Sequence, residues 1–156
     1  MRVFLDANVL FSAAKSDGAV RALLRLLRER GHVCCVDTYV VTEARRNLAA
    51  KRPQALHLLD ALLADLEVAS AATHAVASVD ADWLPEKDRP VLAAAIRLRC
   101  DALVTGDRTH FGAAYGKVFG GVTVHSPRSL ADKFSLALAP FYGTHRTGPK
   151  NRKLRP

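Results

Sequence analysis

Four acidic side chains in this sequence are placed where they could bind a divalent cation. They are Asp6, Glu43, Asp88 and Asp107. Asp6 and Asp107 each directly follow a short apolar run, whereas Glu43 and Asp88 lie in the first turns of segments with a helical pattern. The carboxyl ends of the strands in a parallel sheet meet at one edge, which is where ligands bind. We therefore expect these four carboxylates to converge at that edge.

Each acid also has a purely structural explanation. Glu43 could pair with Arg46 or Asn47 on its own helix face, and Asp88 could serve only as a helix N-cap. The two acids that follow apolar runs could simply end those strands in turns. These explanations suffice for any single acid, but four acids at one predicted edge favour a shared site.

Carboxylates gathered at one place repel one another, and some would take up protons at neutral pH unless a cation compensated their charge. Hard oxygen ligands favour Mg²⁺ or Mn²⁺ over Zn²⁺, and the sequence has no Cys and His spacing typical of a zinc site. One ion or a pair of ions can generate hydroxide and stabilise the charge that develops during an in-line displacement at phosphorus. The predicted chemistry is metal-assisted hydrolysis of phosphodiester bonds.

The elements that must position these acids alternate between strands and helices. Strands are predicted at 2–6, 32–36, 102–105 and 122–125, with a further short strand at either 67–71 or 73–76. Helices are predicted at 17–30, from a cap at Asp37 or Thr38 to about 50, and at 53–66, 91–99, 108–115 and 126–139. Residues 8–15 and 78–87 are predicted to be connections.

This order predicts one α/β domain over residues 1–140, a three-layer α/β/α sandwich with a central parallel sheet of about five strands. Near-continuous apolar runs such as 32–36 are typical of strands that are buried on both faces. The composition changes near the end of the chain, where residues 143–156 carry five Lys or Arg and no acid. We interpret residues 141–156 as a basic tail that contacts RNA or a protein partner, or that only adds charge to the surface.

The composition restricts the class of partner. The formal net charge is +8, from 23 Lys and Arg against 15 Asp and Glu, which favours a nucleic acid or an acidic protein, although a merely basic protein would look the same. Cys34, Cys35 and Cys100 have no C-x-x-C spacing, and we expect reduced thiols. No signal peptide and no apolar run long enough for a membrane span are visible, so we expect a cytoplasmic protein.

Four sequence blocks resemble the signature of the PIN-domain nucleases. The blocks are Phe4–Leu10 (FLDANVL), Thr42–Ala44 (TEA), Asp88–Ala95 (DRPVLAAA) and Leu103–Asp107 (LVTGD). Each block alone is weakly specific, but four blocks in this order and at this spacing are specific. The resemblance covers roughly residues 1–132, and it is closest to the small bacterial and archaeal members, which include the VapC-type toxins.

The resemblance implies a Mg²⁺- or Mn²⁺-dependent endoribonuclease with a flavodoxin-like fold. It implies that Asp6 and Asp107 bind metal directly, and that Glu43 and Asp88 bind a second ion or hold and activate the attacking water. It also implies the toxin of a type II toxin–antitoxin pair, with a small antitoxin protein as partner and a homodimer as the assembly.

Two polar positions and one departure accompany these acids. Asn8 and Thr105 match polar positions of the family, which we interpret as groups that orient the carboxylates. Many relatives carry a further acid two or three residues after the last Asp, where this chain has Thr109 and His110. This departure leaves the occupancy of a second metal site open, and His110 could contact a phosphate or only pack.

Basic and aromatic residues near the acids fit an RNA substrate. The arginines that could neutralise phosphates on either side of the scissile bond are Arg45, Arg46, Arg89 and Arg108. Each of them could equally be an ordinary surface arginine. Tyr39 and Phe111 could stack on a base, but we favour packing in the core or at its rim for both.

Three other interpretations compete with a nuclease. A receiver-type phosphotransfer domain shares the sheet order, but it needs an Asp after the third strand and a late Lys, and neither is convincingly placed. A haloacid-dehalogenase-like phosphatase needs an acid two residues beyond Asp6, where Asn8 stands. The third interpretation is a PIN-fold protein that binds RNA or a partner without cutting, against which the four intact acids argue.

Overall fold

The computed structural model describes residues 1–72 and 81–134. Its elements follow in chain order: β1 (Arg2–Leu5), α1 (Ala7–Lys15), α2 (Ala19–Glu29), β2 (Val33–Asp37), α3 (Thr38–Lys51), the 3₁₀ turn η1 (Pro53–Ala55), α4 (Leu56–Leu63), β3 (Glu67–Ala69), α5 (Arg89–Arg97), β4 (Ala102–Val104), α6 (Arg108–Phe111), the 3₁₀ turn η2 (Gly112–Ala114), β5 (Val118–Phe119), β6 (Val122–His125) and α7 (Pro127–Lys133).

The strands form one six-stranded sheet in the order β3-β2-β1-β4-β6-β5. Neighbouring strands are parallel from β3 through to β6, and only the two-residue β5 runs antiparallel, against β6. The predicted central parallel sheet of about five strands is therefore confirmed. Because β1 pairs with β2 on one side and β4 on the other, the strand order reverses at β1 and β4. Such a reversal opens a crevice at the carboxyl ends of the two strands.

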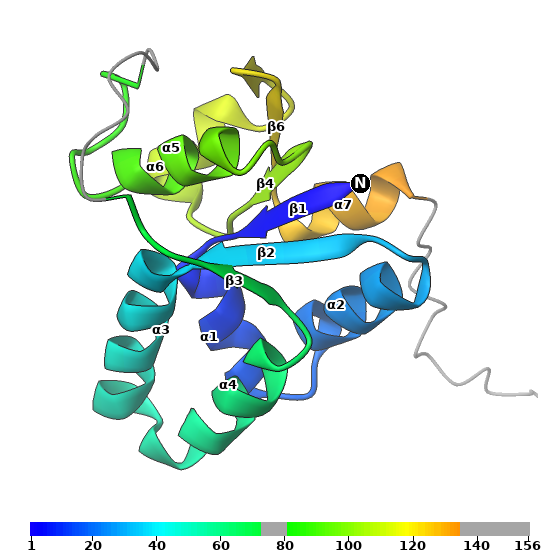
Figure 1. The fold of residues 1–156 in the computed structure, drawn as a ribbon, viewed down its shortest axis with the longest axis vertical. Coiled ribbons are helices and arrows are strands. Elements are labelled where there is room, and N and C mark those ends of the chain that lie inside the picture. The colour runs from blue at the N-terminus through cyan, green and yellow to red at the C-terminus, as the bar shows by residue number, and fades with distance from the viewer. Residues whose placement is uncertain (73–80, 135–156) are drawn as a thin grey trace, which may run out of the picture.

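Helices cover both faces of the sheet, as the predicted α/β/α sandwich requires. Figure 1 shows α1–α4 on one side of the sheet and α5 and α6 on the other. The right-handed crossover rule explains this division, since the chain moves outward from β1 to β3 and then returns past β1 to build β4 and β6. The core lies between these layers, and Val3, Phe4 and Leu5 on β1 are fully buried within it.

The interpretation of residues 8–15 as a connection was wrong, because α1 occupies Ala7–Lys15. Asp6 is its N-cap, and Val9, Leu10, Ala13 and Ala14 form its buried face. An N-cap acid followed by apolar residues at helical spacing was a usable signal in the sequence. The correction matters for function, since it places Asp6 at the junction between a strand and a helix.

A hairpin formed by β5 and β6 was also missed. Gly120 and Gly121 connect the two strands and have φ values of 55° and 85°, as the two central residues of a type I′ turn require. An added Cβ at Gly120 would come within 2.8 Å of Ile96 Cδ1. The Gly-Gly pair between two short apolar runs was therefore the signal for this hairpin.

The other predicted elements have shifted bounds. Asp37, and not Thr38, caps α3 through a hydrogen bond from Val40 N at 3.1 Å. The helix predicted at 53–66 is divided into η1 and α4. The third strand is at Glu67–Ala69, while the alternative at 73–76 lies outside the described residues. The end of the last predicted helix and the basic tail at 141–156 also lie outside them.

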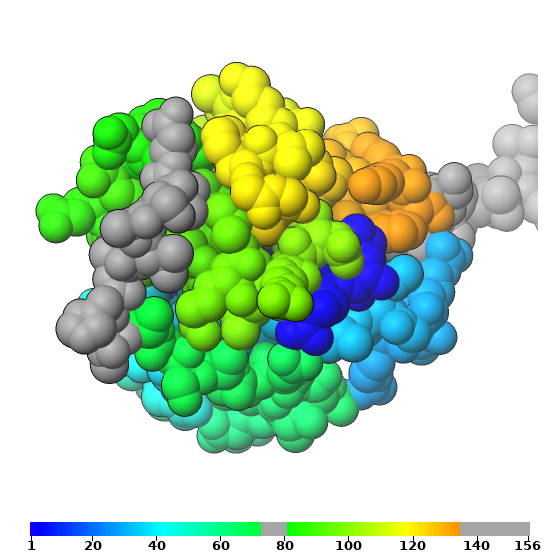
Figure 2. Space-filling view, turned by 45° about the horizontal axis from the view of Figure 1, so that its top comes forward, coloured from blue at the N-terminus to red at the C-terminus, as the bar shows by residue number. Residues whose placement is uncertain are grey.

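The amino-terminal edge of the sheet has acids of its own. Figure 2 shows the start of the chain, in blue, at the surface beside the segment that leads into β4. There the Arg2 backbone N–H donates to Asp101 Oδ2 at 2.7 Å, and the Arg2 guanidinium pairs with Glu67 at 2.7 Å. These acids stand where strands begin, so they support the sheet away from the four candidate acids.

The cysteines and helices bear on two further expectations. Cys34, Cys35 and Cys100 are free and buried, and burial raises the pKa of the Cys34 thiol to about 12. No helix within residues 1–72 and 81–134 is long and apolar enough to cross a membrane.

Candidate functional site

Asp6 lies at the carboxyl end of β1 with its side chain turned into the protein. Only 6% of the surface of Asp6 is exposed to solvent. Its Oδ1 accepts a hydrogen bond from Ala7 N at 2.7 Å, which caps α1, and its Oδ2 accepts one from Thr105 Oγ1 at 2.7 Å. One carboxylate therefore joins the end of β1 to the end of β4, at the point where the strand order reverses.

Burial raises the pKa of the Asp6 carboxyl to about 6. Hydrogen bonds from Thr105 and Ala7 oppose this rise, whereas the negative charges of Glu43 and Asp88 add to it. Ionisation of the buried Asp6 carboxyl is therefore unfavourable, and the negative charges of Glu43 and Asp88 make it more so.

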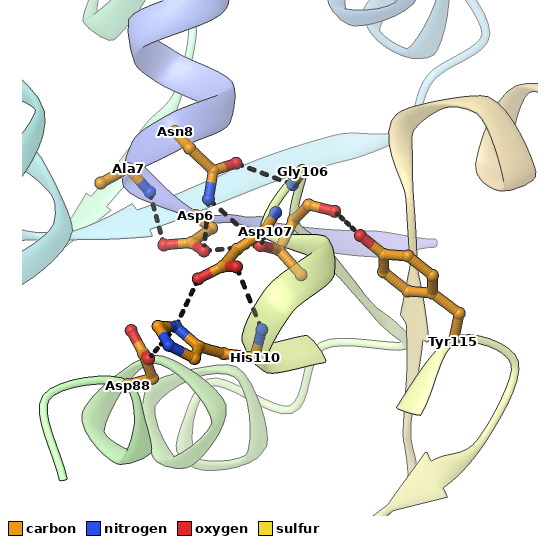
Figure 3. A network of polar contacts seen from close by, with 9 residues as sticks. Asp6, Ala7, Asn8, Asp88, Gly106, Asp107, His110 and Tyr115 are labelled. Atoms are coloured by element: carbon orange, nitrogen blue, oxygen red, sulfur yellow. Dashed lines mark hydrogen bonds and ion pairs between the residues drawn. The ribbon is translucent and has the colours of Figure 1, made fainter. Parts of the chain in front are cut away.

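Asn8 and Thr105 hold Asp6 in place through a connected network of hydrogen bonds, and Figure 3 shows Asp6 and Asn8 within it. Asn8 Nδ2 donates to Asp6 Oδ2 at 2.9 Å and to Thr105 Oγ1 at 3.2 Å. Asn8 Oδ1 accepts from Gly106 N at 2.7 Å, and Thr105 Oγ1 accepts from Asp107 N at 3.1 Å. The network therefore orders the loop after β4 as well as the carboxylate of Asp6.

A second group of side chains joins the starts of α5 and α6. His110 Nδ1 lies 2.7 Å from Asp107 Oδ2 and 3.0 Å from Asp88 Oδ2. The three ligand atoms of Asp88, Asp107 and His110 all lie within 4.8 Å of one another, and this is the one such group among the described residues. Two of the four candidate acids are therefore brought together, with an imidazole between them.

Capping alone does not explain these two acids. Asp107 does cap α6, since its Oδ1 accepts from His110 N at 3.1 Å. Asp88 occupies the N-cap position of α5, but its side chain makes no capping hydrogen bond and turns toward His110 instead (Figure 3). Burial raises the pKa of the Asp88 carboxyl, the charges of His110 and Lys87 lower it, and the Asp107 carboxylate raises it.

Glu43 comes to the same region from α3, but it does not belong to the close group. It is partly buried, and no ion pair within the described part of the chain involves it, so the expected alternative of a pair with Arg46 is not observed. Burial raises the pKa of the Tyr39 hydroxyl, and the charges of Glu43 and Asp88 raise it further. Glu43 and Asp88 therefore both lie near Tyr39.

A family model described as "PIN domain" matches residues 2–109. The chain belongs to the PIN-domain family. The sequence blocks that suggested this family contribute Asp6, Asn8, Asp88, Thr105 and Asp107 to the contacts described above.

Solved structures of similar fold are VapBC and VapC proteins. VapBC2 from Rickettsia felis, bound to a DNA fragment from its promoter, has a TM-score of 0.60 and 16% identity over 81% of this chain and 98% of that chain. DNA-bound VapBC from Salmonella typhimurium has a TM-score of 0.59 and 15% identity over 81% and 98%. VapC20 from Mycobacterium tuberculosis, a toxin that cleaves the sarcin–ricin loop, has a TM-score of 0.52 and 12% identity over 75% and 98%. None of the curated proteins matches this sequence.

The arginines of this PIN domain differ in how firmly they are held. Arg45 pairs with Asp60 of α4 at 2.8 Å, and Arg89 donates to the Leu84 carbonyl at 3.0 Å. Arg46 and Arg108 are exposed. The charge of Arg46 lowers the pKa of the Tyr39 hydroxyl, and that of Arg108 lowers the pKa of the Tyr115 hydroxyl. All four arginines are exposed, and Arg46 and Arg108 are the two that make no hydrogen bond or ion pair among the described residues.

Two contributors to the site were not predicted from the sequence, and one aromatic residue near it belongs to the core. The Tyr115 hydroxyl donates to the Thr105 carbonyl at 2.9 Å, and nothing in the sequence linked these two residues. At Gly106 an added Cβ would lie 3.2 Å from Asn8 Oδ1; the glycine before the last Asp was the available signal. Phe111 is fully buried and packs edge-on against Trp83, which confirms the favoured interpretation of core packing and excludes base stacking.

Proposed function

We propose that this PIN domain is a Mg²⁺- or Mn²⁺-dependent endoribonuclease that hydrolyses RNA phosphodiester bonds. The observation that carries the proposal is the gathering of Asp88, Asp107 and His110 beside the buried Asp6, at the carboxyl ends of β1 and β4. The family supports nuclease chemistry, since the resemblance noted in the sequence is to PIN-domain nucleases.

The residues present fit a divalent cation. Asp88 Oδ2 is shielded from solvent and accepts no hydrogen bond, and the burial of Asp6 raises the pKa of its carboxyl. Asp88 Oδ2 lies 3.0 Å from His110 Nδ1 but accepts no hydrogen bond, and the Asp6 carboxylate has only neutral donors among the described residues. A bound cation would compensate the negative charge of both groups. Asp6, Asp107, Asp88 and Glu43 are the residues that would hold it. When bound, the cation would supply a nucleophile at neutral pH and stabilise the charge on the reacting phosphate.

The chain's own residues then divide the remaining work. Asn8 and Thr105 keep the Asp6 carboxylate in one orientation, because each donates to its Oδ2. Glu43 makes no ion pair within the described residues, so its carboxylate can accept a proton from the attacking water. Arg46 and Arg108 are exposed beside the acids and can bind phosphates of the RNA. Arg45 and Arg89 each have one guanidinium nitrogen in a hydrogen bond, with Asp60 and with the Leu84 carbonyl, and their remaining donors can also reach a phosphate.

We further propose that the protein is the toxin of a type II toxin–antitoxin pair, with a small antitoxin as partner and a homodimer as its own assembly. The support is the VapC-like fold: the Rickettsia and Salmonella structures are VapBC assemblies, and the Mycobacterium protein is a toxin. The net charge of +8 suits both an RNA substrate and an acidic partner.

Cleavage of RNA by the purified protein tests the nuclease. End-labelled single-stranded RNA and hairpins, including a sarcin–ricin loop hairpin, are incubated with Mg²⁺, Mn²⁺ or EDTA. We expect cleavage with either ion and none in EDTA. Asp6→Asn and Asp107→Asn should each lower the rate more than about 100-fold, because a metal-binding carboxylate contributes more than its supporting groups, which are worth about 10- to 100-fold.

Asp132→Asn is the matched control. Asp132 is an exposed acid on α7, which packs against α2 and β6, so this variant should cleave like the wild type. Circular dichroism and thermal melting establish that the inactive variants are folded. Wild-type protein that binds these RNAs but leaves them intact with both ions would instead support a PIN-fold protein that binds without cutting.

A further inference from the structure

The residue that departs from the family pattern lies at the centre of the closest cluster in the site. His110 is three residues after Asp107, and this spacing places both side chains on one side of the short helix α6. Its Nδ1 faces Asp107 Oδ2 at 2.7 Å and Asp88 Oδ2 at 3.0 Å. In Figure 3 the imidazole stands between the two carboxylates.

The contacts of this imidazole leave one carboxylate oxygen without a hydrogen bond. The short contact to Asp107 Oδ2 has hydrogen-bond geometry, whereas Asp88 Oδ2 is shielded from solvent and accepts no hydrogen bond in spite of its proximity to Nδ1. A buried carboxylate oxygen without a donor is destabilising, because no hydrogen bond compensates the loss of its hydration. A cation held by all three groups would remove this cost, because one ion can bind several ligand atoms at once.

The separations between the three groups suit a small divalent ion. Ligand atoms bound to such an ion at about 2.1 Å lie roughly 3 Å apart when they are adjacent. The Nδ1 atom is 2.7 and 3.0 Å from the two carboxylate oxygens, and all three atoms lie within 4.8 Å. The side chains therefore need little movement to become ligands of one ion.

The nitrogen donor changes which ion is preferred. Mg²⁺ strongly favours oxygen ligands, whereas imidazole suits later first-row transition metals such as Fe²⁺, Ni²⁺ and Zn²⁺. Mn²⁺ also prefers oxygen ligands, but as a first-row transition metal it accepts a nitrogen ligand more readily than Mg²⁺ does. We propose that Asp88, Asp107 and His110 form a mixed nitrogen–oxygen site that selects a first-row transition metal over Mg²⁺, with His110 Nδ1 as a direct ligand. The inference rests on the proposed function only for the use of the ion, because binding itself can be measured without RNA.

Mn²⁺ is the probe, because it is paramagnetic and its binding can be followed directly. The full chain, purified free of metal, is titrated with Mn²⁺ and with Mg²⁺ by calorimetry, and pulsed electron paramagnetic resonance detects ¹⁴N coupled to bound Mn²⁺. We expect Mn²⁺ to bind at least tenfold more tightly than Mg²⁺ and to show imidazole ¹⁴N coupling. His110→Ala should lose the coupling and at least tenfold in Mn²⁺ affinity, while His110→Asp should restore binding through oxygen and remove the preference for Mn²⁺.

His57→Ala is the matched control. His57 is exposed on α4, so its removal should leave Mn²⁺ affinity and ¹⁴N coupling unchanged. Bound Mn²⁺ without ¹⁴N coupling, coupling that persists in His110→Ala, or equal affinity for Mn²⁺ and Mg²⁺ would overturn the inference. Nitrogen-coupled Mn²⁺ in a protein that cuts no RNA would leave the inference standing and remove the nuclease. Equal RNA cleavage with Mg²⁺ and Mn²⁺, together with no nitrogen coupling, would support the nuclease and overturn the mixed nitrogen–oxygen site.

Discussion

Asp6 shows how one side chain can serve folding and, as proposed, catalysis. Its Oδ1 caps α1 and its Oδ2 accepts hydrogen bonds from Asn8 and Thr105, so local and long-range contacts hold it in one orientation. Burial keeps this carboxylate away from water at an energetic cost, which its raised pKa of about 6 records. Burial destabilises the ionised form of a carboxylate that has no cation beside it, and a bound cation would offset this penalty.

The raised pKa of Asp6 predicts how stability depends on pH in the metal-free protein. Because the folded-state pKa lies above the ordinary value of 3.8, the folded state holds a proton that the unfolded state has already released. The free energy of unfolding should therefore fall by up to about 3 kcal/mol as the pH rises from about 4 to about 6.5. The unfolding free energies of the wild type and of Asp6→Asn are measured by denaturant titration in EDTA across this pH range. The pH dependence of their difference gives the contribution of Asp6.

Asp6→Asn cannot ionise at this position, so its unfolding free energy should lack this part of the pH dependence. The exposed Asp132→Asn control should follow the wild type at every pH. The same pH slope in wild type and Asp6→Asn would show that the Asp6 carboxyl has an ordinary pKa in the folded protein.

The loop between β4 and α6 is the element that aligns the site. Thr105, Gly106 and Asp107 follow β4 directly, and each makes a hydrogen bond within the network of Asp6 and Asn8. Gly106 brings its backbone close to the Asn8 side chain, with a hydrogen bond of 2.7 Å from N to Oδ1. The absence of a side chain at this position is therefore part of the geometry of the site.

Gly106→Ala should disturb this alignment while leaving the fold intact. The new Cβ would lie 3.2 Å from Asn8 Oδ1, which is close enough to push that side chain and loosen its hold on Asp6. We expect about a tenfold loss in the rate of RNA cleavage, as for other groups that orient metal-binding carboxylates, with a loss of about 1 kcal/mol or less in unfolding free energy.

Gly112→Ala provides the comparison. At Gly112 the nearest atom to an added Cβ is Arg108 Cβ at 3.9 Å, an ordinary contact. Cleavage rates and melting curves of this variant should match those of the wild type. Equal rates for Gly106→Ala and the wild type would mean that the Asn8 contact does not position the catalytic groups.

At the scale of the whole molecule, the sheet topology brings distant parts of the chain together. β1 and β4 are separated by almost a hundred residues in the sequence, yet they are neighbours in the sheet. Their parallel direction puts Asp6 and Thr105 at the same edge, and α5 and α6 bring Asp88 and Asp107 there. The site is therefore a property of the tertiary fold, and no single element of the chain contains it.

The proposed role as a toxin predicts an effect on growing cells. Induced expression of the wild-type chain should stop growth, because free toxin would cleave cellular RNA. Asp107→Asn, expressed to the same level by immunoblot, should leave growth unaffected. Co-expression of a small protein encoded beside the gene should restore growth and co-purify with the chain. Undisturbed growth at high wild-type expression would contradict toxin activity and leave the nuclease proposal to its own test.

The sequence by itself determined the fold class and the family. Near-continuous apolar runs such as residues 32–36 and Ala102–Val104 predict buried parallel strands, because a strand covered on both faces must be largely apolar. Asp6 and Asp107 could be selected because they stand at the ends of such runs, and Glu43 and Asp88 because they lie in the first turns of predicted helices. The prediction is wrong at residues 8–15, which form part of α1 and not a connection. The two-residue β5 is absent from the prediction, because so short a strand depends on its partner β6.

Only the tertiary structure decided how the acids are distributed within the site. Helical spacing explains the approach of His110 to Asp107, but its contact with Asp88 depends on how α5 and α6 pack on the sheet. The same packing sets Asp6 in its own network with Asn8 and Thr105, and it leaves Glu43 outside the close group. Local sequence patterns determine the direction of a side chain on its own element, whereas distances between elements follow from the packing of the core between them.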